Sequence, residues 1–439
     1  MSAGKRKFFF YVLFLAFITV GGGIALYSQG FRFNISDLAI QKIGGIFVRS
    51  NPSDAEIALD KKIIKNKSWL LQSGTLINNL IPGRHALVIK KDGYREWQKN
   101  ILVEPSLVSE VDAVVLVKET GPVKIYENVN DFWAAGNNLM REKNSEIFYN
   151  GTLLPGEKFI AASNDGQFVI AHASKTNAYF IYDARNERPA LNLSLLFWNL
   201  KKRVLDLPGQ VPIDQITFSP YSNSQFLIKT KAALYLLDTE QLDIVLLDES
   251  PAISIFISKF HAFWQTKDGS LWILDPEATS SKSLVLKSDK IKAALSYSGK
   301  NKFNIGVLEE GGRLLVSNPE SENLRLVATK AALFGFSPDN QKIAFIDEDG
   351  QVNIEDIYKK KKVGFRLPIE LPVESFLWYK DSEHLIIRFA DGSVYFTEND
   401  GLNPINAYKL AEGTGKYFYA ENENLLYFTK GADIFTFAF

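Results

Sequence analysis

Cysteine is absent from the 439 residues of this chain. Its absence excludes disulfide bonds, catalysis by a thiolate and cysteine-ligated zinc sites. Histidine is scarce as well, because the chain has only His85, His172, His261 and His384, which lie far apart. A histidine-rich metal site is therefore not supported, and we identify no metal-ligating residues, no metal and no other cofactor.

An excess of charge of either sign is also missing. The 50 lysine and arginine residues equal the 50 aspartate and glutamate residues, so the formal net charge is zero. This balance argues against a nucleic-acid-binding protein with a basic surface and against a long charged tail. Hydrophobic residues make up 46% of the chain, which is too many for a disordered protein. The length suits two or three domains of roughly 100–200 residues each.

Catalytic signatures are missing too. The chain has no Gly-x-Ser-x-Gly nucleophile elbow, no Gly-x-x-x-x-Gly-Lys-Ser/Thr phosphate loop and no Asp-x-Asp-x-Asp-Gly calcium loop. Carboxylate pairs such as Asp347/Asp349 and Glu309/Glu310 fall at expected turns, where acidic side chains are common for local hydrogen bonding. We identify no catalytic and no cofactor-binding residues, and we predict that the protein is not an enzyme.

One long hydrophobic run is present, at residues 8–27, and it follows three basic residues at 5–7. Twenty helical residues span about 30 Å, the thickness of the hydrocarbon core of a bilayer. The basic cluster predicts a cytoplasmic N-terminus, with everything after the anchor outside the cytoplasm. We expect a cytoplasmic tail at 1–7, a single transmembrane helix at 8–27 and a stalk at 28–43. A signal peptide cleaved after Ala25 is the alternative, although its apolar run is usually about 7–15 residues.

A small β domain is predicted at residues 44–118. Breaker residues at 51–54 and at Pro82-Gly83 separate short segments of alternating polarity, such as 85–91. This spacing is typical of a β-sandwich. His85 lies in an alternating strand with no second histidine or carboxylate pattern beside it, so we expect a packed or solvent-facing side chain rather than a ligand.

The same segment resembles the PEGA domain. The resemblance rests on the opening strand with Asn51-Pro52-Ser53-Asp54, on Ile81-Pro82-Gly83 and on Asp92-Gly93-Tyr94. The family turn usually reads Pro-Glu-Gly, whereas here Gly83 follows Pro82 directly, so no role is assigned to the missing glutamate. The resemblance implies an extracytoplasmic module without an established catalytic role.

The remaining residues, 119–439, contain an internal repeat of strand, polar turn, apolar strand, tight turn and alternating strand. Its copies are anchored at residues 132, 160, 216, 255, 294, 336, 377 and 416. The mean spacing of about 41 residues is that of a four-stranded propeller blade. Asp-Gly pairs that begin at residues 165, 268, 349 and 391 supply the positive φ of tight hairpins.

The fold class predicted from these features is all-β, with an N-terminal transmembrane helix, a PEGA-like β-sandwich and a β-propeller. Eight anchors indicate about eight blades, and seven is the alternative if the weak copy at Phe132 is not a full blade. We predict that the C-terminal strand at 431–439 pairs with the strand near 123–126 and closes the ring. Phe336-Ser337-Pro338-Asp339 resembles WD-type and TolB-type propeller repeats, which implies an interaction platform or, in some members, an enzyme.

Two segments stand outside the repeat. Residues 191–212 are densely apolar, and they predict either a partly helical loop that caps one face or contacts a partner, or an outer strand with a long connector. The lysine run at 359–362 predicts a solvated hairpin tip, with contact to an anionic envelope polymer as the alternative.

The function that we expect is that of a single-pass, envelope-anchored interaction protein in the cell membrane. Its propeller would present the central opening and turn loops to an envelope protein or glycan. The alternatives are a propeller-type enzyme acting on carbohydrate or peptide, and the ectodomain of a multi-protein sensor. Clustered carboxylates along the central funnel would indicate the enzyme, and an aromatic or uncharged funnel would indicate binding.

Overall fold

A computed structural model describes residues 3–34, 39–64, 66, 74–135, 138–149, 152–154, 158–183, 191–275, 281–298, 303–317 and 323–439. The chain folds into two compact units. The first unit comprises residues 1–120 with 402–406 and 439, and the second comprises 121–401 with 407–438. Apart from the helices α1 and α2, the regular elements among the described residues are β-strands, as the sequence predicts.

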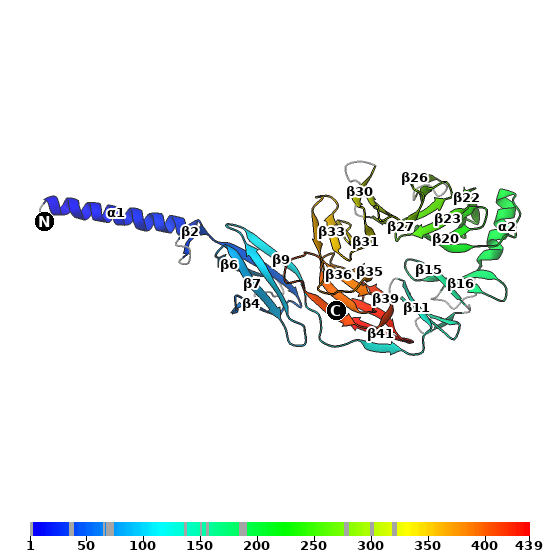
Figure 1. The fold of residues 1–439 in the computed structure, drawn as a ribbon, viewed down its shortest axis with the longest axis horizontal. Helices are drawn as coiled ribbons and strands as arrows, with labels where there is room; N and C mark the ends of the chain where they lie inside the picture. The colour runs from blue at the N-terminus through cyan, green and yellow to red at the C-terminus, as the bar shows by residue number, and fades with distance from the viewer. Residues whose placement is uncertain are drawn as a thin grey trace. The chain divides into compact units, whose positions relative to one another are not determined.

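Helix α1 (Ala3–Ser28) includes the predicted hydrophobic run, and Phe8–Ser28 is long and apolar enough to cross a membrane (Figure 1). Its side chains from Phe8 onward are exposed on every side of the helix. A helix that is apolar all round needs an apolar environment, since it has no polar face to turn toward water. The helix ends at Ser28, and Gly30 follows it with a φ of +85° that suits glycine and an N–H that donates to the Tyr27 carbonyl over 3.1 Å.

The predicted stalk contains a hairpin of β1 (Phe31–Asn34) and β2 (Ala39–Lys42). The residues that flank this hairpin are tied together, because the N–H of Ile43 donates to the carbonyl of Gly30 over 2.9 Å. The chain therefore leaves the hairpin close to the point where it entered.

Two facing sheets form the predicted sandwich. One sheet has the order β6-β3-β9 and the other β5-β4-β7-β8. The strands are β3 (Gly44–Asn51), β4 (Glu56–Leu59), β5 (Lys62–Ile64), β6 (Thr75–Leu80), β7 (Gly83–Lys90), β8 (Trp97–Val103) and β9 (Val108–Val115). Trp97, Ile101 and Val103 alternate with exposed residues along β8 and pack into the core with Ile46 and Leu87. Pro82-Gly83 forms the β6–β7 turn, as predicted.

The second unit consists of four-stranded antiparallel sheets in chain order (Figure 1). The first four sheets are β11 (Asp131–Ala135), β12 (Asn138–Lys143), β13 (Glu146–Tyr149), β14 (Thr152–Leu154); β15 (Lys158–Ala162), β16 (Phe168–Ala173), β17 (Ala178–Asp183), β18 (Leu191–Asn192); β19 (Gln215–Ser219), β20 (Ser222–Lys229), β21 (Leu234–Asp238), β22 (Asp243–Asp248); and β23 (Ala252–Ile257), β24 (Ala262–Thr266), β25 (Ser270–Leu274), β26 (Lys282–Lys287).

The next three sheets are β27 (Ile291–Ser298), β28 (Phe303–Glu309), β29 (Leu314–Ser317), β30 (Leu324–Ala328); β31 (Ala331–Phe336), β32 (Lys342–Asp347), β33 (Val352–Asp356), β34 (Lys362–Phe365); and β35 (Val373–Trp378), β36 (His384–Phe389), β37 (Val394–Glu398), β38 (Ala407–Ala411). The seven sequence anchors from 132 to 377 each lie in the first strand of a sheet. First strands of neighbouring sheets, such as β15 and β19 or β27 and β31, contact one another and form the inner edge.

The last sheet is built from both ends of the second unit. It has the order β10-β41-β40-β39, with β10 (Val123–Tyr126), β39 (Thr414–Ala420), β40 (Leu425–Lys430) and β41 (Asp433–Ala438). Val123 pairs with Thr436 and Lys124 with Phe435 in antiparallel register. The predicted closing pair is therefore confirmed. Eight four-stranded sheets occur among the described residues of the second unit, and eight blades remains our prediction for the ring.

Packing between neighbouring sheets runs around the unit. Five apolar clusters fill the spaces from the β11–β14 sheet to the β31–β34 sheet. Trp378 on β35 donates its indole N–H to the Gly335 carbonyl on β31 over 3.0 Å. The rings of Tyr379 and Tyr419 lie 5.2 Å apart, and Ile434 packs with Phe132 across the closing sheet. Packing sheets in this cyclic order buries both faces of each and defines a β-propeller.

Helix α2 (Leu193–Leu205) confirms the partly helical loop predicted at 191–212. The Asn192 side chain caps it by accepting from the N–H of Leu195, and Asp206 ends it in the left-handed conformation. Phe197 and Leu200 are buried against the neighbouring sheets, and the helix contacts β17 and β22. The inserted residues 191–212 thus pack against the neighbouring sheets through the apolar side chains of α2.

Candidate functional site

Three of the tight turns between the second and third strands of a sheet bond to the linker or strand that follows the sheet. At three junctions the carbonyl of a turn glycine accepts a backbone N–H from the linker or first strand that follows over 2.8 Å; the pairs are Gly269 with Ser288, Gly312 with Ala331 and Gly392 with Thr414. The approach is close, because a Cβ built on Gly392 would lie 2.7 Å from the Thr414 nitrogen. These junctions are therefore closed by backbone contact.

The corresponding turn of the β31–β34 sheet also has a glycine but lacks this bond. Gly350 has a positive φ of 77°, like the other turn glycines, but a Cβ built on it would meet no atom within 4 Å. The segment that follows β34 contains Pro368 and Pro372, which have no N–H to donate. Among the described residues, no backbone bond joins this turn to the next sheet.

Linker length explains the open junction. The linker of residues 366–372 between β34 and β35 has seven residues, whereas the linkers after β22, β26, β30 and β38 have only two or three. The extra residues carry the chain outward instead of directly into the next first strand. A space therefore remains between the turn and the linker.

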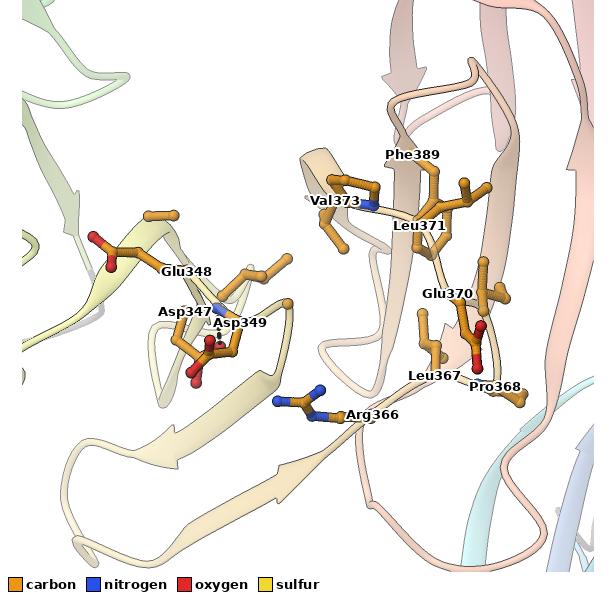
Figure 2. Close-up of a pocket in the computed structure, with 15 residues that line it drawn as sticks. Asp347, Glu348, Asp349, Arg366, Leu367, Pro368, Glu370, Leu371, Val373 and Phe389 are labelled. Atoms are coloured by element: carbon orange, nitrogen blue, oxygen red, sulfur yellow. Dashed lines mark hydrogen bonds between the residues drawn. The ribbon is translucent and has the colours of Figure 1, made fainter.

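This space is a cavity of about 990 Å³, which we call the linker groove. Its walls are the 347–350 turn, the 366–372 linker and Phe389 at the end of β36. Figure 2 shows Leu371 and Phe389 on the side opposite the turn, with Arg366 extending toward Asp347 and Asp349. Leu371 is 39% exposed, so the apolar lining is accessible from solvent.

Charge at the linker groove is mainly negative. Asp347, Glu348, Asp349 and Glu370 line it together with a single cation, Arg366, which gives a formal charge of −3. The Asp347 carboxylate accepts the N–H groups of Asp349 (3.1 Å) and Gln351 (2.8 Å) and so holds the turn. Within the described part of the chain, Arg366 and Glu370 form no ion pair, and both are exposed. Their charges are available to a ligand.

Carboxylates are few along the first strands of the described sheets. Along the first strands of the described sheets the acidic residues are Asp131 and Glu374. Asp131 lies 3.1 Å from Lys416, and Glu374 lies 2.5 Å from Arg388. Each of these two carboxylates is therefore paired with a cation.

Two of the histidines are buried in the propeller. His261 lies 2.9 Å from the Ser296 hydroxyl, and burial lowers its pKa to about 4. His384 lies 2.7 Å from Asp381 and stacks on Phe396. Because His261 and His384 are at most 5% exposed, neither can reach a substrate.

The other two histidines lie on strands. His172 pairs with Asn177 over 3.0 Å. His85 lies 2.6 Å from an Asp60 carboxylate oxygen and 2.7 Å from the Ile81 carbonyl, a pairing that sequence reasoning missed because Asp60 is 25 residues away. No group of three metal-ligating side chains occurs in the described ranges.

The lysine run at 359–362 follows the sequence prediction of a solvated tip. It lies at the β33–β34 connection, and the Lys359 ammonium is 3.6 Å from Asp356. Lys362 lies over the Phe345 ring. The run is at the opposite end of β34 from Arg366 and takes no part in the linker groove.

Sequence reasoning also missed the linker groove itself. It assigned Asp347 and Asp349 to a turn, which is where they lie, but it did not single out the linker. The available signals were its two prolines and its additional length.

Comparison with known families identifies the first domain. Residues 43–115 match the PEGA domain, which agrees with the sandwich of β3 to β9. No protein of curated function matches the chain. The similarities to solved structures reported next all have TM-scores below 0.5. The assignment of a propeller fold therefore relies on the arrangement of the sheets in this structure and not on these similarities.

Three solved structures illustrate the similarity. Dihydro-heme d1 dehydrogenase NirN, in complex with DHE, has a TM-score of 0.49 and 10% identity, and the match covers 74% of this chain and 71% of NirN. The C-terminal WD40 domain of Sif2 has a TM-score of 0.48 and 12% identity, with 72% and 97% covered. BamB from Moraxella catarrhalis has a TM-score of 0.47 and 9% identity, with 73% and 98% covered.

Proposed function

We propose that this protein is a membrane-anchored, non-enzymatic interaction protein whose propeller binds a protein segment outside the cytoplasm. The observation that carries the proposal is the linker groove. It has an apolar lining and an acidic rim, and it lies at a junction where the turn glycine makes no backbone bond to the next sheet. Its volume of about 990 Å³ lies at the upper end of the usual range of ligand pockets.

The chemistry of the groove favours a particular kind of ligand. Leucine, proline, valine and phenylalanine side chains line it, so an apolar side chain of the partner can be buried there. The formal charge of −3 favours lysine or arginine beside that side chain and disfavours acidic partners. We therefore propose a peptide segment with an apolar residue flanked by basic residues, rather than a glycan.

Support for the location comes from α1 and the PEGA domain. The helix is apolar on all sides, and the basic residues 5–7 that precede its apolar run favour a cytoplasmic N-terminus. Because the chain has no cysteine, a single Asp92→Cys variant gives a clean topology test. A membrane-impermeant thiol reagent should label it in intact cells, and labelling only after lysis would contradict the proposed orientation.

The binding proposal is tested by the full-length protein in lipid nanodiscs, used to select from a random peptide library. We expect enrichment of sequences with an apolar residue between lysines or arginines. The Leu371→Glu variant should bind the selected peptides at least about fivefold more weakly, since a buried apolar anchor contributes more than about 1 kcal/mol.

Leu326→Glu is the matched control, because Leu326 is 49% exposed on the outer strand β30 and lies outside the groove. It should retain wild-type binding. Equal binding by the Leu371→Glu variant, or selection of acidic sequences, would contradict the proposal. Recovery of selected peptides in shortened form would instead support the enzyme alternative.

A further inference from the structure

The PEGA domain has an apolar end and a charged end. Its apolar end consists of Ile81, Leu102, Leu107 and Val108, which are 42%, 52%, 54% and 50% exposed. These residues surround the start of β3: Val108 pairs with Gly45, and the N–H of Gly45 donates to the Leu107 carbonyl. Ser109 bonds to the Leu102 carbonyl over 2.6 Å, which joins the two strands at this end.

The opposite end of the domain is charged. Lys90 lies 3.0 Å from Glu56, and Lys91 lies 2.5 Å from Asp54, beside Asp92 in a hollow lined mostly by charged residues. Strand β7 connects the two ends, and its eight residues cover about 23 Å at about 3.3 Å per residue. Four of the six exposed large hydrophobic residues in the described part of the domain therefore lie at the end where β3 begins; the other two are Ile63 on β5 and Leu76 on β6.

That end is also the one tied to the hydrophobic helix. Ser28 is the last residue of α1, and Gly30 accepts the N–H of Ile43, the residue directly before β3. The residues between Gly30 and Ile43 would otherwise allow β3 to lie far from the helix, and this hydrogen bond prevents that. The start of β3 cannot move far from the end of the helix while this bond is in place.

Bilayer dimensions then place the apolar end. The 21 residues Phe8–Ser28 span about 31 Å, which matches the hydrocarbon core of about 30 Å. Each headgroup layer outside that core is about 5–8 Å thick. Two residues beyond Ser28 cover at most about 7 Å. Gly30 and the start of β3 therefore lie within the headgroup layer when α1 spans the membrane.

Two cationic side chains suit this position. Arg32 donates to the carbonyls of Tyr27 and Phe31, both over 2.9 Å, and its guanidinium lies 3.5 Å from the centre of the Tyr27 ring. Tyrosine at a helix end is typical of a membrane interface, and an arginine near a helix end extends its charged group to that interface. Arg84 pairs with Leu102 across β7 and β8, at the same end of the domain, where it can meet a lipid phosphate.

We infer that the apolar end of the PEGA domain rests in the outer lipid interface and is a second membrane contact, additional to α1. The inference rests on the proposed membrane anchor. Burial of four exposed aliphatic side chains at the lipid interface fixes the domain against the bilayer instead of leaving it on a free stalk. The charged end then faces away from the membrane.

Single-cysteine labelling of the full chain in liposomes tests this inference. An environment-sensitive fluorophore is attached at Leu107→Cys, at Asp92→Cys or at Leu15→Cys, and spin-labelled lipid serves as the quencher. We expect a blue-shifted, quenched label at position 107 and a water-like, unquenched label at position 92. Quenching at position 15 reports the anchor by itself.

The outcomes separate the two proposals. If position 15 is quenched and position 107 is not, the anchor holds and the lipid contact is wrong, so the apolar end is left to a protein partner or a second copy. If position 15 is not quenched, the anchor is wrong and the lipid contact fails with it.

A second variant separates lipid contact from mere proximity to the helix. A label at Ile81→Cys should lose quenching when Leu107→Glu is added, because a carboxylate in place of an apolar side chain disfavours burial in lipid. Leu76→Glu is the control, since Leu76 is exposed on β6 four residues before the near end of that strand. Unchanged quenching in the Leu107→Glu variant would overturn the lipid contact.

Discussion

Replacement of Ile434 by alanine tests whether the closing sheet holds the propeller together. Ile434 is fully buried and packs with Val129 and Phe132, which connects β41 to the neighbouring sheet. The change removes three carbon atoms at about 0.8 kcal/mol each and leaves a cavity, so we expect a loss of about 2–5 kcal/mol of unfolding free energy.

Chemical unfolding of the full-length protein, followed by tryptophan fluorescence, measures this loss. Ile253→Ala is the matched control, because Ile253 is 49% exposed on β23 and its truncation should change stability by less than about 0.5 kcal/mol. A Val129→Ala variant completes a double-mutant cycle, and we expect a coupling energy of about 0.5–3 kcal/mol because the two residues share a cluster.

The reasoning is refuted if Ile434→Ala costs no more than Ile253→Ala. That result would mean that the C-terminal strand does not contribute to a cooperative ring. Zero coupling between Ile434 and Val129 would localise the failure to the junction between the closing sheet and the sheet that follows it.

Two further predictions concern a turn and a titrating side chain. Gly392→Ala should destabilise the protein more than Gly350→Ala in the same unfolding assay; both add the left-handed strain of about 1–2 kcal/mol, but only at Gly392 does the new Cβ meet the Thr414 backbone at 2.7 Å. Burial alone lowers the pKa of His85, but the Ile81 carbonyl and the Asp60 carboxylate outweigh it and raise the net pKa above its ordinary value. The stabilisation is therefore complete below about pH 6.5 and is lost as the pH rises through the folded-state pKa. Hydrogen exchange of the 81–90 peptide, corrected for intrinsic rates, should show this loss in wild type and not in His85→Gln.

The sequence predicted the repeat because each copy obeys the same local physics. A first strand, a polar turn and an apolar second strand recur wherever one sheet must pack between two others. The hydrogen bonds of the Ser-x-Asp turn explain why the polar turn recurs. The Ser337 hydroxyl donates to Asp339, and Asp339 accepts the N–H of Gln341. Ser163 and Asp165 make the same contact in another sheet. Local patterns of this kind are visible in a single sequence.

Pairings between distant residues were partly predictable. The β10–β41 pair followed from the need to close a ring, which is a property of the whole fold. The contact between His85 and Asp60 did not, because it depends on the registers of β4 and β7 rather than on any local motif. Sequence position alone does not encode which side chains two strands bring together.

The linker groove was missed for a different reason, which also explains why it is the best candidate for a site. It arises where one glycine turn lacks the carbonyl bond that three other glycine turns make, and a missing bond leaves no motif in the sequence. The α2 insertion also interrupts the repeat with a long linker, and it provides an internal comparison. There the added residues bury Phe197 and Leu200 against the sheets. At 366–372 the added residues bury Leu367 but leave a cavity with Leu371 exposed, and for this reason we place the proposed ligand there.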